Sequence, residues 1–235
     1  MNRMMSLLFG AALMGSAMIA SAADVAGNVT LATDYRFRGI SQNHGKFSPA
    51  IQGGFDWSSE MGFYVGTWAS NVNFSEAAIE TDVYGGFKGM VNEELGYDVG
   101  VLYYGYPQDG SQHLGYTEVY GSMSFKGAKF GLNYSDNYFA GSGKFYYPYL
   151  EYGFDPVENV SLSFHFGYSG FDKNQAGLNG DDYYTDWKIG VSTKQFGVVW
   201  GLAYVDTNLG DNDGVCGQSA KLCDATAVLS ISKSL

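Results

Sequence analysis

Proline, cysteine and charged side chains are all scarce in this sequence. It contains 4 Pro and 2 Cys among 235 residues, and charged residues make up 16% of it, against about 25% in an average soluble domain. The 13 basic residues are outnumbered by 24 acidic ones, which argues against nucleic acid as a partner because phosphate binding needs an excess of Lys and Arg. Beyond the N-terminal segment no stretch approaches 18 apolar residues, so the sequence predicts no transmembrane helix.

Glycine and aromatic residues are abundant instead. The chain has 33 Gly, 19 Tyr, 16 Phe and 4 Trp, and 46% of its residues are hydrophobic. A composition this hydrophobic is not that of a disordered chain. Richness in Tyr and Gly together with few Pro favours an all-β protein over a helical one.

The first residues indicate export. Arg3 supplies a positive start, the apolar residues 4–19 follow, and Ala20-Ser21-Ala22 is a cleavage signal of the A-x-A type. We therefore predict a signal peptide over residues 1–22, with cleavage after Ala22 or Ala23, and a single β-barrel domain over 23–235. The mature protein is expected outside the cytoplasm.

Alternation of apolar and polar residues dominates the rest of the chain. In the segment 160–169, Val160, Leu162, Phe164, Phe166 and Tyr168 point one way, and the residues between them are small or polar. Twelve such segments are predicted: 27–38, 49–57, 63–71, 79–88, 95–106, 116–125, 129–136, 145–154, 160–169, 182–192, 196–206 and 225–235. In the third segment Tyr64 and Trp68 compete with Phe63 and Val65 for the apolar face.

The connections between these segments alternate in length. Short ones are expected at 58–62, 89–94, 126–128, 155–159 and 193–195. Longer, polar ones are expected at 39–48, 72–78, 107–115, 137–144, 170–181 and 207–224. This alternation is typical of a transmembrane antiparallel up-and-down β-barrel of an outer membrane. An even strand number places both termini on the short-turn, periplasmic side.

A secreted β-sandwich or a soluble barrel would also alternate. Its apolar face would be a core of Leu, Ile and Val, whereas here Tyr, Phe and Trp gather toward strand ends, as in Tyr35-Phe37 and Phe55-Trp57. Aromatic girdles at two membrane interfaces account for that distribution. The expected surroundings are outer-membrane lipid and lipopolysaccharide.

A distinctive series of strings runs from residue 27 to 88. It consists of VTLATDYRFRGISQ (29–42), PAIQGG (49–54), GTWASNV (66–72), Glu80, Asp82 and YGG (84–86). The order resembles the TorF family of proteobacterial porins. The resemblance implies an outer-membrane barrel in a Gram-negative cell and leaves the solute open. The last residue, Leu235, departs from the Phe or Trp that ends many outer-membrane strands.

Charged residues on the polar face are the candidates for lining a pore. They are Asp34, Arg36, Arg38, Asp56, Glu80, Asp82, Lys88, Asp98, Glu118, Glu151, His165, Asp186 and Lys188. They either form a charged constriction that selects solutes or pair with one another and brace the wall. The expected function is a channel for passive diffusion of small hydrophilic solutes. The alternative is a structural or surface-interaction barrel without flow, and the oligomeric state stays open.

Signals for catalysis or cofactors are weak. His165 with Ser161 or Ser163 lacks the orienting group and oxyanion site that serine–histidine catalysis needs, so we expect no enzyme and no cofactor. The acidic loop tips 179–182 and 211–214 leave a calcium site open, although turn chemistry also explains them.

The two cysteines, Cys216 and Cys223, fall in the longest predicted connection. Two cysteines in an exported chain usually pair, so we expect a disulfide that shapes this loop and leaves the barrel wall unchanged.

Overall fold

The computed structural model describes residues 24–43, 48–110, 112–172, 178, 180–210, 212–217 and 221–235. The predicted signal peptide and its cleavage sites lie outside these residues. Within the described ranges, no helix is long and apolar enough to cross a membrane.

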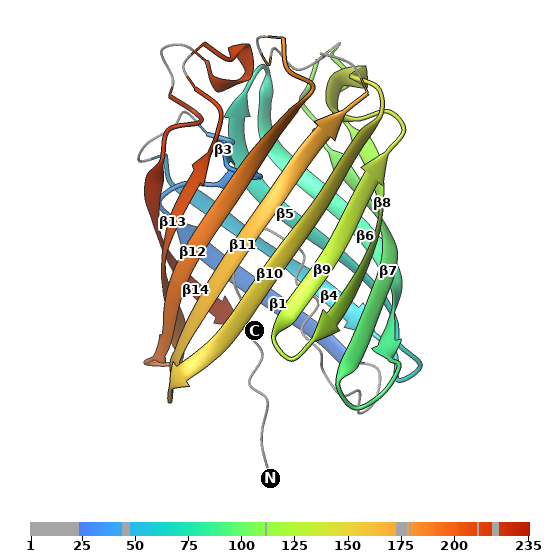
Figure 1. Ribbon diagram of the computed structural model, residues 1–235, viewed down its shortest axis with the longest axis vertical. Coiled ribbons are helices and arrows are strands. Elements are labelled where there is room, and N and C mark those ends of the chain that lie inside the picture. Colours follow the sequence, from blue (N-terminus) through green and yellow to red (C-terminus); the bar gives the residue numbers. More distant parts are fainter. Residues whose placement is uncertain are drawn as a thin grey trace.

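Twelve strands form one closed antiparallel barrel (Figure 1). They are β1 (Asp24–Ala32), β4 (Ala50–Ser58), β5 (Phe63–Phe74), β6 (Ala77–Met90), β7 (Leu95–Gly105), β8 (Tyr116–Phe125), β9 (Ala128–Ser135), β10 (Phe145–Val157), β11 (Val160–Phe171), β12 (Tyr183–Gln195), β13 (Val198–Thr207) and β14 (Thr226–Ser234). Each of these wall strands pairs with the wall strands before and after it in the chain, and β1 pairs with β14 to close the sheet. The predicted fold class is confirmed, and each of the twelve predicted segments overlaps one wall strand, although several bounds differ.

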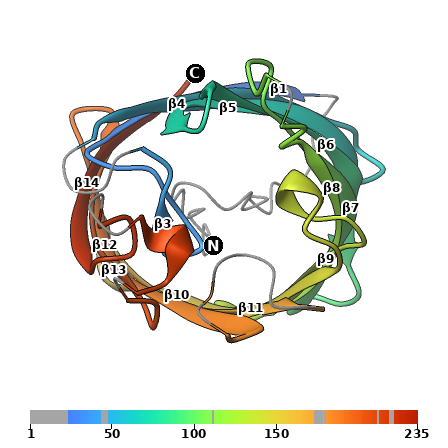
Figure 2. The same cartoon turned by 90° about the horizontal axis from the view of Figure 1, so that it is seen from above.

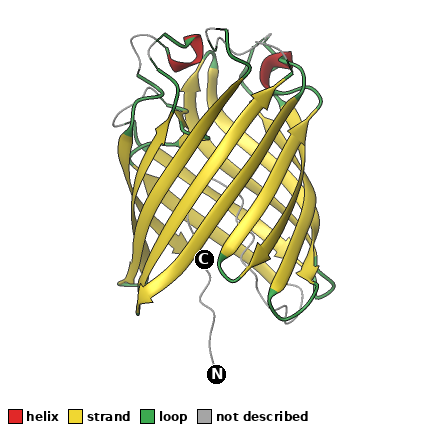
Figure 3. Cartoon of the chain, in the orientation of Figure 1, coloured by secondary structure: helices red, strands yellow, loops and turns green. Residues whose placement is uncertain are grey.

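The two ends of the barrel differ, as the connection lengths predict. Short turns lie at the end where β14 finishes, and longer connections with the two 3-10 helices η1 (Phe139–Gly141) and η2 (Gly214–Cys216) lie at the other (Figures 1 and 3). At the short-turn end, the Leu235 amide donates to the Gly27 carbonyl, which brings the C-terminal residue beside β1.

One long connection was predicted wrongly. The expected loop at 72–78 is only the two residues Ser75 and Glu76, because β5 runs on to Phe74 and β6 starts at Ala77. Ser75 adopts a positive φ of 54°, a conformation suited to tight hairpin turns. Polar residues at the ends of two long strands look like a loop in the sequence. Only the pairing of β5 with β6 shows that they belong to the strands.

The outward face of the wall is apolar. Side chains such as Val99, Phe130 and Leu202 are about half exposed, at 50%, 58% and 44%. The ambiguous third segment is also settled: Phe63 and Val65 face outward, whereas Tyr64 hydrogen-bonds inside the barrel to Asp98. An apolar exterior around a polar interior is the arrangement that a lipid-facing barrel requires.

The first strand is shorter than its alternation predicts. It ends at Ala32 instead of continuing to residue 38. Tyr35, expected in an aromatic girdle, is 3% exposed inside the barrel. Phe37, expected there too, packs edge-on against Tyr104. The alternation continues past Ala32 because residues 33–38 also have two faces, although these residues are not part of the barrel wall.

Tyrosine rings inside the barrel lie across glycine positions of neighbouring strands. A Cβ added at Gly66 would stand 2.5 Å from the Tyr84 ring, and one added at Gly131 would overlap the Tyr149 ring. Gly54 is more restrictive, because an added Cβ would overlap the backbone carbonyl of Thr67 on β5. The abundance of Gly and Tyr therefore reflects one packing pattern, in which a missing side chain makes room for a large one.

We expect Gly54→Ala to destabilise the barrel by about 1–3 kcal/mol, since backbone must shift to admit the methyl group. The matched control is Gly121→Ala, whose added Cβ would meet its nearest atom, Cγ1 of Val99, at 3.7 Å. That control should change stability by less than about 0.5 kcal/mol. Urea unfolding of the refolded proteins in lipid vesicles, followed by tryptophan fluorescence, measures both. Equal stability of the two variants would contradict the packing argument.

Candidate functional site

The candidate site is the interior of the barrel, which the chain itself enters. After β1, residues 33–43, here called the lumen segment, leave the wall and turn inward (Figure 2). The segment contains a small hairpin of β2 (Arg36–Phe37) and β3 (Ile40–Ser41). Its turn residues Arg38 and Gly39 have φ values of 48° and 84°, the positive values of a tight two-residue hairpin.

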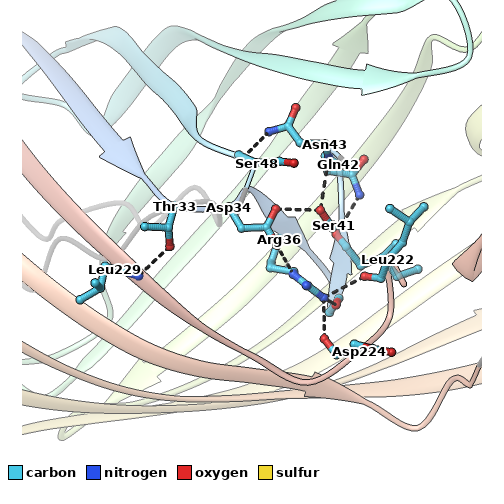
Figure 4. Close-up of polar contacts among 12 residues, drawn as sticks. Thr33, Asp34, Arg36, Ser41, Gln42, Asn43, Ser48, Leu222, Asp224 and Leu229 are labelled. Atoms are coloured by element: carbon cyan, nitrogen blue, oxygen red, sulfur yellow. Dashed lines mark hydrogen bonds and ion pairs between the residues drawn. The ribbon is translucent and has the colours of Figure 1, made fainter. Parts of the chain in front are cut away.

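Arg36 fixes the lumen segment to the connection that precedes β14 (Figure 4). Its Nη1 donates to the carbonyl oxygens of Leu222 at 2.8 Å and of Asp224 at 3.0 Å. Its Nε donates to Asp34 at 2.5 Å, and the Ser41 hydroxyl donates to the same carboxylate at 2.7 Å. Both members of the Arg36–Asp34 pair have side chains only 3% exposed. Such buried charges are stable only when they are paired and hydrogen-bonded, as these are.

Arg38 points across the lumen to the opposite wall. Its Nη2 donates to Oε2 of Glu118 on β8 at 2.8 Å, and the two side chains are 5% and 0% exposed. Its guanidinium carbon lies 4.3 Å from the ring centre of Tyr147 and 4.7 Å from that of Phe145. The lumen segment is therefore attached on both sides of the barrel.

Most wall carboxylates accept hydrogen bonds from tyrosines. Asp56 accepts one from Tyr84 at 2.5 Å, and Asp98 accepts one from Tyr64 at 2.6 Å. Glu80 accepts two, from Tyr35 of the lumen segment at 2.6 Å and from Tyr106 at 2.7 Å. Hydrogen bonds to an ionised acceptor are stronger than neutral ones. The tyrosines that the composition emphasises thus hold the acids in place as well as filling space.

His165 joins two carboxylates. Its Nδ1 lies 3.1 Å from Glu151, and its Nε2 lies 3.3 Å from Asp186. The Tyr147 hydroxyl is 2.7 Å from the same Nε2. Neither serine once considered as a partner contacts this ring: Ser161 donates to Asp155 at 2.6 Å, and Ser163 Oγ has no hydrogen-bond partner among the described residues.

A cavity of about 160 Å³ remains inside the barrel beside the lumen segment. Small side chains of β1, β13 and β14, such as Ala32, Val205 and Ser230, line one side of it. Most of the rest of the lining is aromatic or charged, and it also includes Gln52, Leu102, Ser122 and Asn133. The predicted residues that line it are Asp34, Arg36, Arg38, Asp98, His165, Asp186 and Lys188.

The other predicted residues lie around this cavity rather than on its surface. Asp56, Glu80 and Glu118 are engaged as described above, and Glu151 contacts His165. Asp82 is 4% exposed. Lys88 lies directly opposite Asp98 in the β6–β7 register, with its Nζ 5.3 Å from the Tyr64 ring centre.

Two expectations about the arginines need correction. The sequence predicts Arg36 and Arg38 at the outer end of the first wall strand, 27–38, where acids on neighbouring strands are their candidate partners. They belong instead to the lumen segment, so Arg36 pairs within that segment and Arg38 reaches β8. The residues that sequence reasoning missed are the carbonyls of Leu222 and Asp224 and the rings of Tyr138, Phe145 and Tyr147. The Arg38-Gly39 turn is the only sequence signal that points to them, and it is weak.

The predicted disulfide is present between Cys216 and Cys223, in the connection between β13 and β14. The amide of Leu222 donates to the Cys216 carbonyl at 3.0 Å, and the Leu222 carbonyl accepts from the Ser41 amide and from Arg36. The disulfide therefore restrains the residue that holds the lumen segment.

Among the residues that the structure describes, no three His, Cys, Asp or Glu side chains are grouped as metal ligands. The acidic loop tips considered for calcium include Asn179 and Asp211, which lie outside the described residues.

A family model described as "Bacterial protein of unknown function (Gcw_chp)" matches residues 16–235. The chain belongs to the Gcw_chp family. Among curated proteins, none matches this sequence. Membership of this family does not confirm the resemblance to TorF porins.

Solved porin structures share the fold. The NanC porin matches with a TM-score of 0.52 and 14% identity, over 90% of this chain and 98% of that one. The KdgM porin matches with a TM-score of 0.56 and 9% identity, over 89% and 99% of the two chains. A structure of the KdgM porin in complex with disordered oligogalacturonate gives a TM-score of 0.54 at 8% identity, over 90% and 98%. At these identities the likeness extends to the porin barrel and not to its solute.

We expect the double variant Cys216→Ser/Cys223→Ser to keep its barrel but to loosen the lumen segment. Removing the cross-link frees Leu222, whereas the wall strands make none of their pairing bonds through this loop. Hydrogen–deuterium exchange of peptides covering residues 33–43 should speed up several-fold, while exchange of wall peptides stays unchanged.

The control for this experiment is Lys221→Ser in the same loop. It removes only the exposed ion pair with Asp224, at 4.0 Å, which contributes little. If the double variant and this control exchange alike, the disulfide does not restrain the lumen segment.

Proposed function

We propose that the protein is a porin-like channel of a bacterial outer membrane, through which small hydrophilic solutes diffuse passively. The observation that carries the proposal is a charged and aromatic cavity inside a closed barrel whose outer surface is apolar. The fold shared with NanC and KdgM supports it. In an outer-membrane barrel of this kind, the short turns face the periplasm and the long connections face the outside of the cell.

The size of the cavity limits the solute. A volume of about 160 Å³ is close to the ~150 Å³ of an engineered cavity that admits benzene. Solutes of that order fit in the cavity, and larger ones fit only if the lumen segment moves. The charges around the cavity favour polar solutes, because an apolar one would leave buried charges without water.

The alternative is a structural or surface-interaction barrel without flow. The contacts of Arg36 and Arg38 favour it, since they tie the lumen segment to both sides of the interior. The two functions differ in one measurable property, which is conductance.

We expect the wild-type protein to conduct weakly in a planar lipid bilayer and Arg36→Gln to conduct several-fold more. The substitution removes the hydrogen bonds to Leu222 and Asp224 that fix the lumen segment. Lys233→Gln is the control, because its Nζ bonds the Gly197 carbonyl at the short-turn end, and it should leave conductance unchanged. If neither the wild type nor Arg36→Gln conducts, the proposed channel is wrong and the alternative without flow is favoured.

A further inference from the structure

The Arg38 side chain occupies a pocket made by other parts of the barrel. Glu118 of β8 forms its base, and Tyr104 and Asn133 also donate to the same carboxylate oxygen, at 3.3 and 2.8 Å. Phe145 and Tyr147 of β10 form one side, with Tyr138 of the preceding connection 5.9 Å from the guanidinium carbon. Only Phe37, at 4.6 Å, comes from the lumen segment itself.

These components are the ones that recognise an organic cation. Aromatic ring faces attract a cation through their quadrupole, and the attraction is greatest where water is excluded. A carboxylate at the base adds a charge-assisted hydrogen bond.

Arg38 fills this pocket incompletely. A carboxylate and a guanidinium pair best through two parallel N–H···O bonds, but Arg38 uses only Oε2 of Glu118. The other oxygen, Oε1, is buried and has no hydrogen-bond partner in the described part of the chain. Arg38 also sits at a positive φ of 48°, a conformation that side-chain-bearing residues adopt at a cost. A free guanidinium ion has no backbone φ and can turn to bond both oxygens of Glu118, so neither restriction applies to it.

We propose that Glu118, Tyr138, Phe145 and Tyr147 form a binding site for solutes that carry a guanidinium group, and that Arg38 is its built-in occupant. A guanidinium solute then competes with Arg38 for the pocket, and its binding releases the lumen segment from β8. The inference rests on the proposed channel function for the route by which such a solute reaches the lumen.

The test uses refolded Arg38→Gly protein in detergent micelles and methylguanidinium as the probe. Glycine removes the side chain and accepts the positive φ. Isothermal titration calorimetry should show millimolar binding of methylguanidinium to this variant, at least about tenfold tighter than to the wild type. Urea, a neutral molecule of similar shape, should not bind measurably at the same concentrations.

A second variant separates the pocket from a general effect of the substitution. Arg38→Gly/Glu118→Gln keeps the volume of the pocket and removes its charge, so methylguanidinium binding should fall to the wild-type level. If Arg38→Gly does not refold, its refolding yield is measured with millimolar methylguanidinium or urea. Rescue by methylguanidinium alone supports the site, and no rescue overturns it.

Folded Arg38→Gly that binds methylguanidinium no better than the wild type would also overturn the proposal, leaving Arg38 as a structural contact. Binding is measured without flow, so the channel and the site fail separately. A protein that binds methylguanidinium but never conducts keeps the site and loses the proposed channel.

Discussion

Pairing of β1 with β14 is the constraint on which the rest of the molecule depends. Once these strands pair, every wall strand has two neighbours and the circumference of the sheet is fixed. A closed sheet has no edge left to satisfy, which is what allows strands to cross lipid. It also encloses a fixed volume, so each side chain that points inward must fit beside the others and find a partner for its polar atoms.

A few residue types both fill the interior and supply hydrogen-bond partners for its polar atoms. Tyrosines cover glycine positions of the wall and donate to carboxylates, as Tyr84 does over Gly66 and to Asp56. The lumen segment supplies the arginines that pair with Asp34 and Glu118. Eight inward acids face five inward bases, namely Arg36, Arg38, Lys88, Lys129 and Lys188, and this balance predicts a mild cation preference. The contacts show that most of these charges have fixed partners, so the field felt by a solute depends on the few groups lining the cavity.

Much of the barrel could be predicted from sequence because its signal is local. Side chains in a strand alternate with period two, so a strand such as 160–169 can be predicted from its own residues, without knowing which strands lie beside it. The lumen segment could not be predicted in the same way. Asp34, Arg36 and Arg38 alternate as wall residues would, and what draws them inward are Glu118 and the carbonyls near Leu222, far along the chain. Cavity size and charge pairing likewise arise only when distant strands meet.

The attachment of the lumen segment has a consequence for the order of folding. Arg36 is separated from Leu222 and Asp224 by 186 and 188 residues, and contacts between such distant positions form late because chain entropy opposes them. Neither carbonyl stands near Arg36 until β14 has paired with β1. The contacts of Arg36 with these carbonyls therefore form only once the barrel has closed. The lumen segment is therefore held on both sides of the interior only in the closed barrel.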